Sequence, residues 1–141
     1  MNGVGSSPAI AAGALSAAVA GGVMAALTAS AGGLQASLPA VVTLTAALLG
    51  GGLLFGWLIH TERLRAGFGP GIVFWIAAWP AARLVQEALV AGGGGEAGLS
   101  QGVAGFLMYQ AMVGGAFGLG FVLLHSQIAM LLNRVGRDSA R

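Results

Sequence analysis

"GALSAAVAGGVMAALTAS", residues 13–30, contains no charged residue and places small side chains four positions apart. The small residues form two neighbouring rows, one of Gly13, Ala17, Gly21 and Ala25 and one of Ala14, Ala18, Gly22 and Ala26. In lipid, helices associate through close backbone approach at small residues rather than through a hydrophobic drive. The stretch therefore predicts a membrane helix with one broad, flat face. That face packs either against a helix of the same chain or against another chain.

The composition of the whole chain is that of an integral membrane protein. Of its 141 residues, 57% are hydrophobic and 7% are charged, whereas a soluble domain carries about 25% charged residues. The net charge of +2 comes from a few scattered arginines, which excludes a nucleic-acid-binding face. The absence of cysteine excludes disulfides and thiol catalysis, and no metal-ligand spacing is present, so we expect no metal site.

Four apolar runs are long enough to cross a hydrocarbon core of about 30 Å, which requires ~20 helical residues. They cover residues 8–31, 38–60, 68–91 and 103–132, and a basic tail, 133–141, follows. Short connections make consecutive helices antiparallel neighbours. The sequence thus predicts an all-α fold, a single transmembrane domain (residues 1–141) of four helices arranged up-down-up-down.

The arginines predict the orientation of this bundle. Two of them lie in the second connection and three in the tail, whereas the first and third connections have none: Arg63, Arg65, Arg134, Arg137 and Arg141. Positive residues accumulate on the cytoplasmic side of membrane proteins. We therefore expect both termini and the second connection to be cytoplasmic, in a bacterial-type plasma membrane.

Further close-packing faces are expected on the second and fourth helices, at Gly52 and Gly56 and at Gly114 and Gly118. Three of the four helices then carry such faces, which is more than an isolated four-helix bundle requires. The excess predicts contacts with other membrane subunits or self-association, in addition to the bilayer and bound lipid.

The third run contains "FWIAAWPAARLVQEA", residues 74–88, which carries a proline and two opposite charges. Pro80 predicts a kink because it removes a helical hydrogen bond. Arg83 and Glu87 are four residues apart and share a helix face, with Gln86 beside them. An intramembrane charge costs at least ~2.5 kcal/mol. Either Arg83 and Glu87 neutralise each other, or Arg83 binds an external anion, quinone or lipid headgroup.

Two histidines are the candidate cofactor ligands. His60 and His125 are expected at similar depth on different helices, as a bis-histidine b-type haem requires, and one histidine suffices for a chlorin. His125 also ends a row on the fourth helix that contains Tyr109, Val113, Phe117 and Phe121. The row either lines a pigment, haem or quinone, or it is an ordinary core or lipid-facing stripe. Histidines near a membrane interface also occur without any cofactor.

No serine, histidine and acid converge at one predicted depth, so we do not expect an enzyme. The leading hypothesis is a non-catalytic accessory subunit of a larger membrane complex, of a respiratory or photosynthetic electron-transport type. The alternatives are a small homo-oligomeric transporter or channel, with Arg83, Glu87, Gln86 and Gln110 near a polar path, and a b-type haem or pigment-binding protein.

Overall fold

The computed structural model describes residues 8–32, 34–92 and 102–138, which contain four α-helices. They are α1 (Pro8–Gly32), α2 (Leu34–His60), α3 (Phe68–Gly92) and α4 (Gly102–Asp138). Three of them contain a segment long and apolar enough to cross a membrane, Val41–His60, Phe68–Leu89 and Gly102–Arg137. The apolar segment of α1, Pro8–Val23, is shorter. The all-helical fold class is confirmed, with three helices of membrane-spanning length.

Two helix boundaries differ from the prediction by more than one residue. Helix α2 begins at Leu34 instead of residue 38, and α4 continues to Asp138 instead of ending at 132. No proline interrupts the tail, and Arg137 in the last turn of α4 interacts favourably with the negative end of the helix dipole. With 37 residues, α4 is about 55 Å long, which greatly exceeds the hydrocarbon core.

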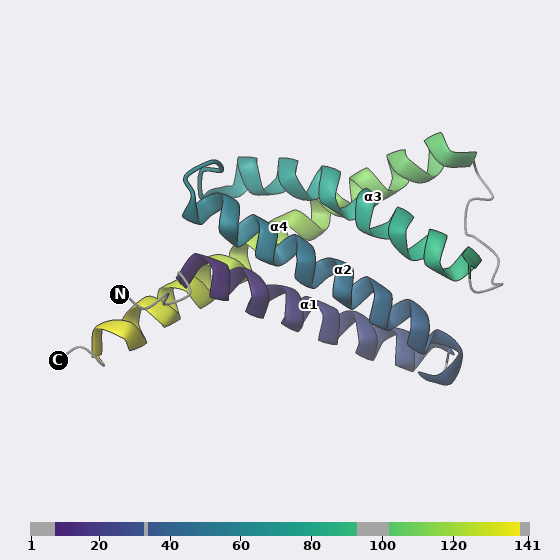
Figure 1. Cartoon of the computed structure of the whole chain (residues 1–141), viewed down its shortest axis with the longest axis horizontal. Helices are drawn as coiled ribbons and strands as arrows, with labels where there is room; N and C mark the ends of the chain where they lie inside the picture. The colour runs from purple at the N-terminus through teal and green to yellow at the C-terminus, as the bar shows by residue number, and fades with distance from the viewer. Residues whose placement is uncertain (1–7, 33, 93–101, 139–141) are drawn as a thin grey trace.

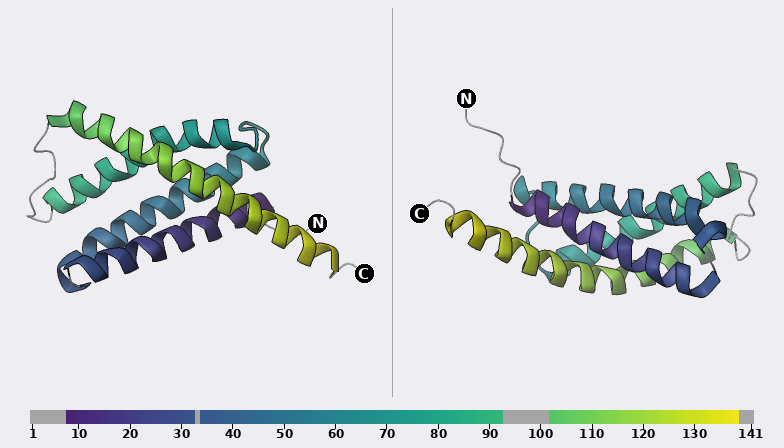
Figure 2. Two further views of the ribbon diagram at one scale, coloured as in Figure 1. Left: turned by 180° about the vertical axis from the view of Figure 1, so that it is seen from behind. Right: turned by 90° about the horizontal axis from the view of Figure 1, so that it is seen from below.

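The helices form two hairpins, α1 with α2 and α3 with α4 (Figure 1). The most extensive contacts lie within each hairpin, and α1–α4 and α2–α3 contacts join the two. Helix α4 crosses the α1–α2 hairpin obliquely, and its C-terminal segment extends beyond the start of α1 (Figure 2). Helices α3 and α4 cross near their middles, and the end of α3 lies apart from the start of α4 (Figure 1).

Backbone contact between glycines joins α1 to α2. A Cβ atom on Gly52 would lie 2.5 Å from the carbonyl oxygen of Gly13 and 2.7 Å from the Cβ of Ala17. A Cβ atom on Gly56 would lie 2.5 Å from the carbonyl oxygen of Ala9. Real Cβ atoms essentially never approach other atoms this closely, so only glycine fits at these positions. The hairpin depends on this exclusion of side chains.

Most of the small residues in these rows pack against a neighbouring helix of the same chain. Gly13, Ala17 and Gly21 pack on α2, while Gly114 and Gly118 pack on Trp75, Trp79 and Ile72 of α3. The side chain of Ala25 lies outside the described residues. These residues therefore pack inside the bundle, and the expected contacts with other chains remain a prediction. The second row of α1 differs, because Ala18, Gly22 and Ala26 are exposed and a Cβ atom on Gly22 would meet nothing within 4 Å.

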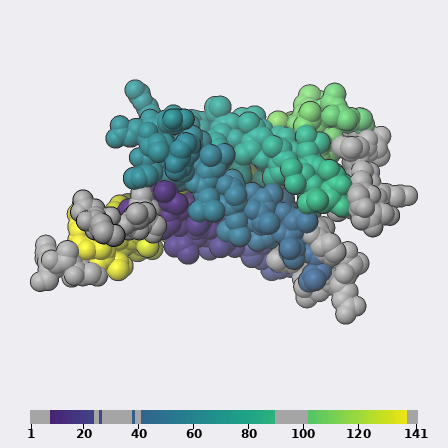
Figure 3. All heavy atoms as spheres, viewed as in Figure 1, coloured from purple at the N-terminus to yellow at the C-terminus, as the bar shows by residue number. Residues whose placement is uncertain are grey.

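One end of the bundle carries the described arginines other than Arg83. The His125 ring lies 3.2 Å from the carbonyl oxygen of Ala9 and has its centroid 5.2 Å from that of Phe55. The start of α1, the end of α2 and the C-terminal part of α4 are thus together, as Figure 3 also shows for α1 and α4. Arginines of the α2–α3 loop and of the α4 terminus share this end: Arg63, Arg65, Arg134 and Arg137.

Replacing Gly52 by leucine should separate α1 from α2, whereas the same change at Gly50 should be tolerated. Gly50 lies two residues away on α2, and a Cβ atom there would meet nothing within 4 Å. Because the atoms that obstruct residue 52 include backbone, we expect Gly52→Leu to cost about 3 kcal/mol. Thermal unfolding in mild detergent, followed by circular dichroism, measures the difference. Equal melting temperatures for both variants would contradict the α1–α2 packing.

Candidate functional site

Pro80 lies at the midpoint of α3 and is buried. The helix continues through it but changes direction along its length (Figure 1). Proline has no amide hydrogen, so the carbonyl of Ile76, four residues earlier, loses its usual helical donor. The bend expected from the sequence places the polar second half of α3 at an angle to the first half.

Arg83, Gln86 and Glu87 form a polar cluster on the second half of α3. The Nη2 atom of Arg83 donates to Oε1 of Glu87 over 2.8 Å, and its Nη1 atom donates to Oε1 of Gln86. The Arg83 and Glu87 side chains are 24% and 11% exposed. The two charges thus neutralise each other four residues apart on one helix, as the self-paired interpretation predicts.

A buried hydrogen bond connects this region of α3 to α4. The indole Nε1 of Trp79 donates to Oε1 of Gln110 over 2.8 Å. Trp79 precedes Arg83 by one helical turn, so the bond lies next to the polar cluster. The sequence analysis named Gln110 but missed Trp79. The available signal was that a buried indole N–H requires an acceptor, which Gln110 supplies from the neighbouring span.

Aromatic rings fill the centre of the bundle and connect the two hairpins. Trp75 of α3 lies 4.6 Å from Phe121 and 4.7 Å from Phe117 of α4, and Phe55 of α2 lies 5.5 Å from Phe121, between ring centroids. The row on α4 that begins at Tyr109 and ends at His125 does not lie on one side of the bundle. Phe121 and His125 point inward, whereas Tyr109 is 62% exposed.

The two histidines do not fit a bis-histidine haem. His125 is enclosed by protein, since its ring lies against Phe55 and Phe121 and its Nε2 lies 3.2 Å from the carbonyl oxygen of Ala9. His60 is the exposed last residue of α2. A haem iron needs a free imidazole nitrogen on each of its faces, and a chlorin needs one. Bis-histidine ligation would therefore require His125 to leave its present contacts.

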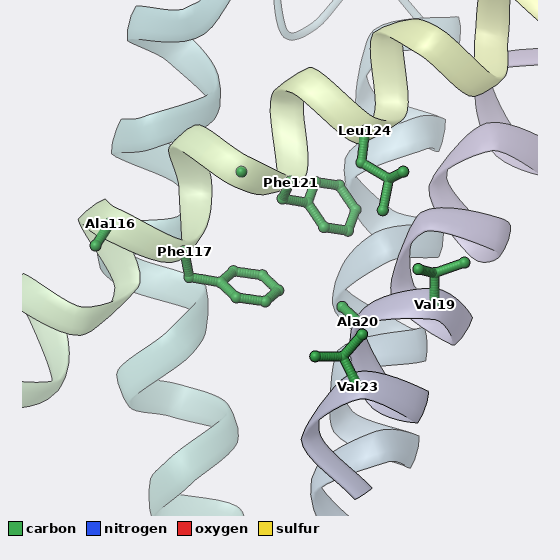
Figure 4. Close-up of a pocket in the computed structure, with 8 residues that line it drawn as sticks. Val19, Ala20, Val23, Ala116, Phe117, Phe121 and Leu124 are labelled. Carbon is green, nitrogen blue, oxygen red and sulfur yellow. The ribbon is translucent and has the colours of Figure 1, made fainter. Parts of the chain in front are cut away.

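Two apolar cavities flank the aromatic centre. One, of about 340 Å³, lies between α1 and α4 and is lined by Val19, Val23, Phe117, Phe121, Leu124 and neighbouring small residues (Figure 4). The other, of about 350 Å³, lies between α2 and α3 and is lined by Leu54, Phe74, Val85 and small residues. Arg83, Gln86, Glu87, Gln110 and the histidines line neither cavity.

Comparison with protein-family models, with curated proteins and with solved structures finds no match for this chain. Its function is therefore argued from the arrangement of its own residues.

The Arg83–Glu87 pair predicts a distinctive double-mutant cycle. Glu87→Ala leaves the Arg83 cation without its carboxylate in the second half of α3. We expect this change to lower the free energy of unfolding by about 2 kcal/mol, less than for a fully buried pair, because the Arg83 side chain is 24% exposed. The double variant Arg83→Ala/Glu87→Ala should recover part of this loss, because it removes both charges. Thermal unfolding of the four proteins in one detergent provides the measurement.

The opposite pattern would indicate an external ligand on Arg83. In that case Arg83→Ala would be as damaging alone as in the double variant, and Glu87→Ala would behave like the unaltered protein. Arg83→Lys provides the control for geometry, because lysine keeps the charge but cannot donate to two neighbours in the fork geometry of a guanidinium.

Proposed function

We propose that this chain is a non-catalytic accessory subunit of a larger membrane complex, which it joins through the outer face of α1. The observation that carries the proposal is the exposed row of Ala18, Gly22 and Ala26. The adjacent row of α1 is already occupied by α2, so these residues are not needed to hold the bundle together.

An exposed row of small residues has a physical meaning in a membrane. Lipid chains cover an apolar surface of any shape, but a flat row of small residues permits another helix to approach closely. A Cβ atom on Gly22 would meet nothing within 4 Å, whereas one on Gly21 would lie 2.7 Å from Thr45 Cγ2. Gly21 thus faces a contact inside the bundle, whereas Gly22, the next residue, faces an open surface.

The polar cluster supports a structural role over transport. Arg83 is paired on its own helix, and Trp79 and Gln110 satisfy each other across α3 and α4. These residues line neither of the two apolar cavities. The Trp79–Gln110 bond joins α3 to α4, and in this proposal the subunit contributes a scaffold rather than a path for a substrate.

In this proposal the chain crosses a plasma membrane of bacterial type four times, with both termini and the α2–α3 loop in the cytoplasm. The collection of arginines at one end of the bundle supports that orientation. Cysteines placed at Ser100 and at Ser139 should therefore react with a membrane-impermeant maleimide from opposite sides, Ser139 only after the cytoplasmic face is opened. Reaction of both from the same side would contradict four spans.

Replacing Gly22 by leucine should remove the chain from its complex without unfolding it. The complex is measured by native electrophoresis and mass spectrometry after solubilisation of native membranes in mild detergent, and folding by the melting temperature of the purified chain. Gly50→Leu, also at an open position, is the matched control and should keep the complex. Loss of the complex in both variants, or in neither, would contradict the α1 interface.

The same preparation distinguishes the alternative functions. Foreign subunits that co-migrate with the unaltered chain and are lost from Gly22→Leu support the accessory role. A homo-oligomer without foreign subunits would indicate the transporter or channel class instead. A Soret absorption band would indicate a haem protein and would require the surroundings of His125 to rearrange.

A further inference from the structure

The C-terminal part of α4 carries a hollow that is lined by two arginines. Met130, Asn133, Arg134 and Arg137 line a cavity of about 230 Å³. Because they follow one another at spacings of three or four residues, they share one face of the helix. The volume greatly exceeds the ~30 Å³ that one water molecule occupies in the liquid. The hollow therefore has room for a small molecule or for one chemical group of a larger molecule.

The two guanidinium groups in this hollow are not neutralised by the described side chains. Arg134 and Arg137 are exposed, and neither forms an ion pair with a described residue. Of the described acids, Glu87 is paired with Arg83, and Glu62 lies in the α2–α3 loop. Like charges that are neighbours on one helix face repel each other. An anion held between the two arginines would remove this repulsion.

A phosphate group matches these donors better than a carboxylate does. Each guanidinium carries five N–H donors in a planar fork, and the amide of Asn133 adds two more. One fork already satisfies both oxygens of a carboxylate, whereas a tetrahedral phosphate offers oxygens in several directions to more than one fork. A phosphate monoester also carries about −1.5 to −2 charges at neutral pH, which balances two arginines.

Two negative groups oppose an anion at this place. The last carbonyls of α4 carry a partial charge of about −0.5. Asp138 follows Arg134 by four residues, and its side chain lies outside the described residues. The two arginines carry more charge than these two groups together, so the hollow stays positive. Removing the carboxylate of Asp138 should therefore strengthen the binding of an anion.

We propose that the hollow at Asn133, Arg134 and Arg137 is a binding site for a phosphate group. Both guanidinium groups donate to phosphate oxygens, the amide of Asn133 donates a further hydrogen bond, and Met130 lines the apolar side. The phosphate belongs to a lipid headgroup or to a soluble phosphate compound. No residue of the site lies on α1, so the site does not depend on the proposed accessory role.

Binding to the delipidated chain in mild detergent tests the site. The probes are phosphatidic acid, diacylglycerol with the same acyl chains, and inorganic phosphate, and isothermal titration calorimetry measures each Kd. If phosphatidic acid binds at least about tenfold more tightly than both other probes, the site takes a lipid headgroup. If inorganic phosphate binds as tightly as phosphatidic acid, the site takes a soluble phosphate. Equal binding of the two lipids, without binding of inorganic phosphate, would overturn the proposal.

Removal of the two charges tests which residues hold the phosphate. Arg134→Gln/Arg137→Gln should raise the Kd of the tighter phosphate probe at least about tenfold, because charge-assisted hydrogen bonds are lost. Arg63→Gln/Arg65→Gln is the matched control, since it removes the same charge from exposed residues at the same end of the bundle. The control should change the Kd less than about twofold, because salt screens distant charges. Equal weakening by the two variants would show attraction by net charge alone and would overturn the site.

Two milder variants keep the test decisive if the double glutamine variant does not fold. Arg134→Lys/Arg137→Lys keeps both charges but loses the guanidinium forks, so it should raise the Kd. Asp138→Asn removes the competing carboxylate and should lower the Kd. The melting temperature of each variant without probe verifies that it is folded. An unchanged Kd in both folded variants would overturn the proposal.

Discussion

The backbone contact of α1 with α2 is the interaction on which the rest of the structure depends. Gly13 meets Gly52 and Gly56 with no space for a side chain. Lipid chains are as apolar as leucine, so helices in a membrane gain little from burying apolar surface and depend on close van der Waals contact. The α3–α4 hairpin uses the same device at Gly114 and Gly118, where backbone and Cβ atoms of α3 take the place of a second glycine row.

Aromatic and polar contacts join and complete these hairpins. The cluster of Phe55, Trp75 and Phe121 connects α2, α3 and α4. The polar contacts are of two kinds, since Arg83 is neutralised by a residue one turn away on the same helix, whereas Trp79 of α3 is satisfied by Gln110 of α4. Such pairing allows these charged and polar groups to remain in an apolar bundle, because each of them keeps a hydrogen-bonding partner. The polar residues thus contribute to the packing of the bundle.

Two outer surfaces are not explained by the bundle itself. The exposed small-residue row of α1 permits close helix approach, and the apolar side chains of Leu131 and Val135 near the end of α4 are also exposed. Both α1 and α4 also line the cavity that contains Phe117 and Phe121.

The sequence by itself determined the helical class, the apolar segments, the proline in α3 and the spacing of Arg83 and Glu87, because these depend on composition and on the local periodicity of one helix. It also located the small-residue rows, but it did not show which row is occupied. Gly21 and Gly22 are neighbours of identical chemistry, and only the tertiary structure turns one toward Thr45 and the other toward open space. The tertiary structure likewise pairs Trp79 with Gln110 and places His125 against Ala9, two contacts between residues far apart in the chain. Such contacts depend on the angles at which helices cross, and these angles result from the fit of all the side chains together.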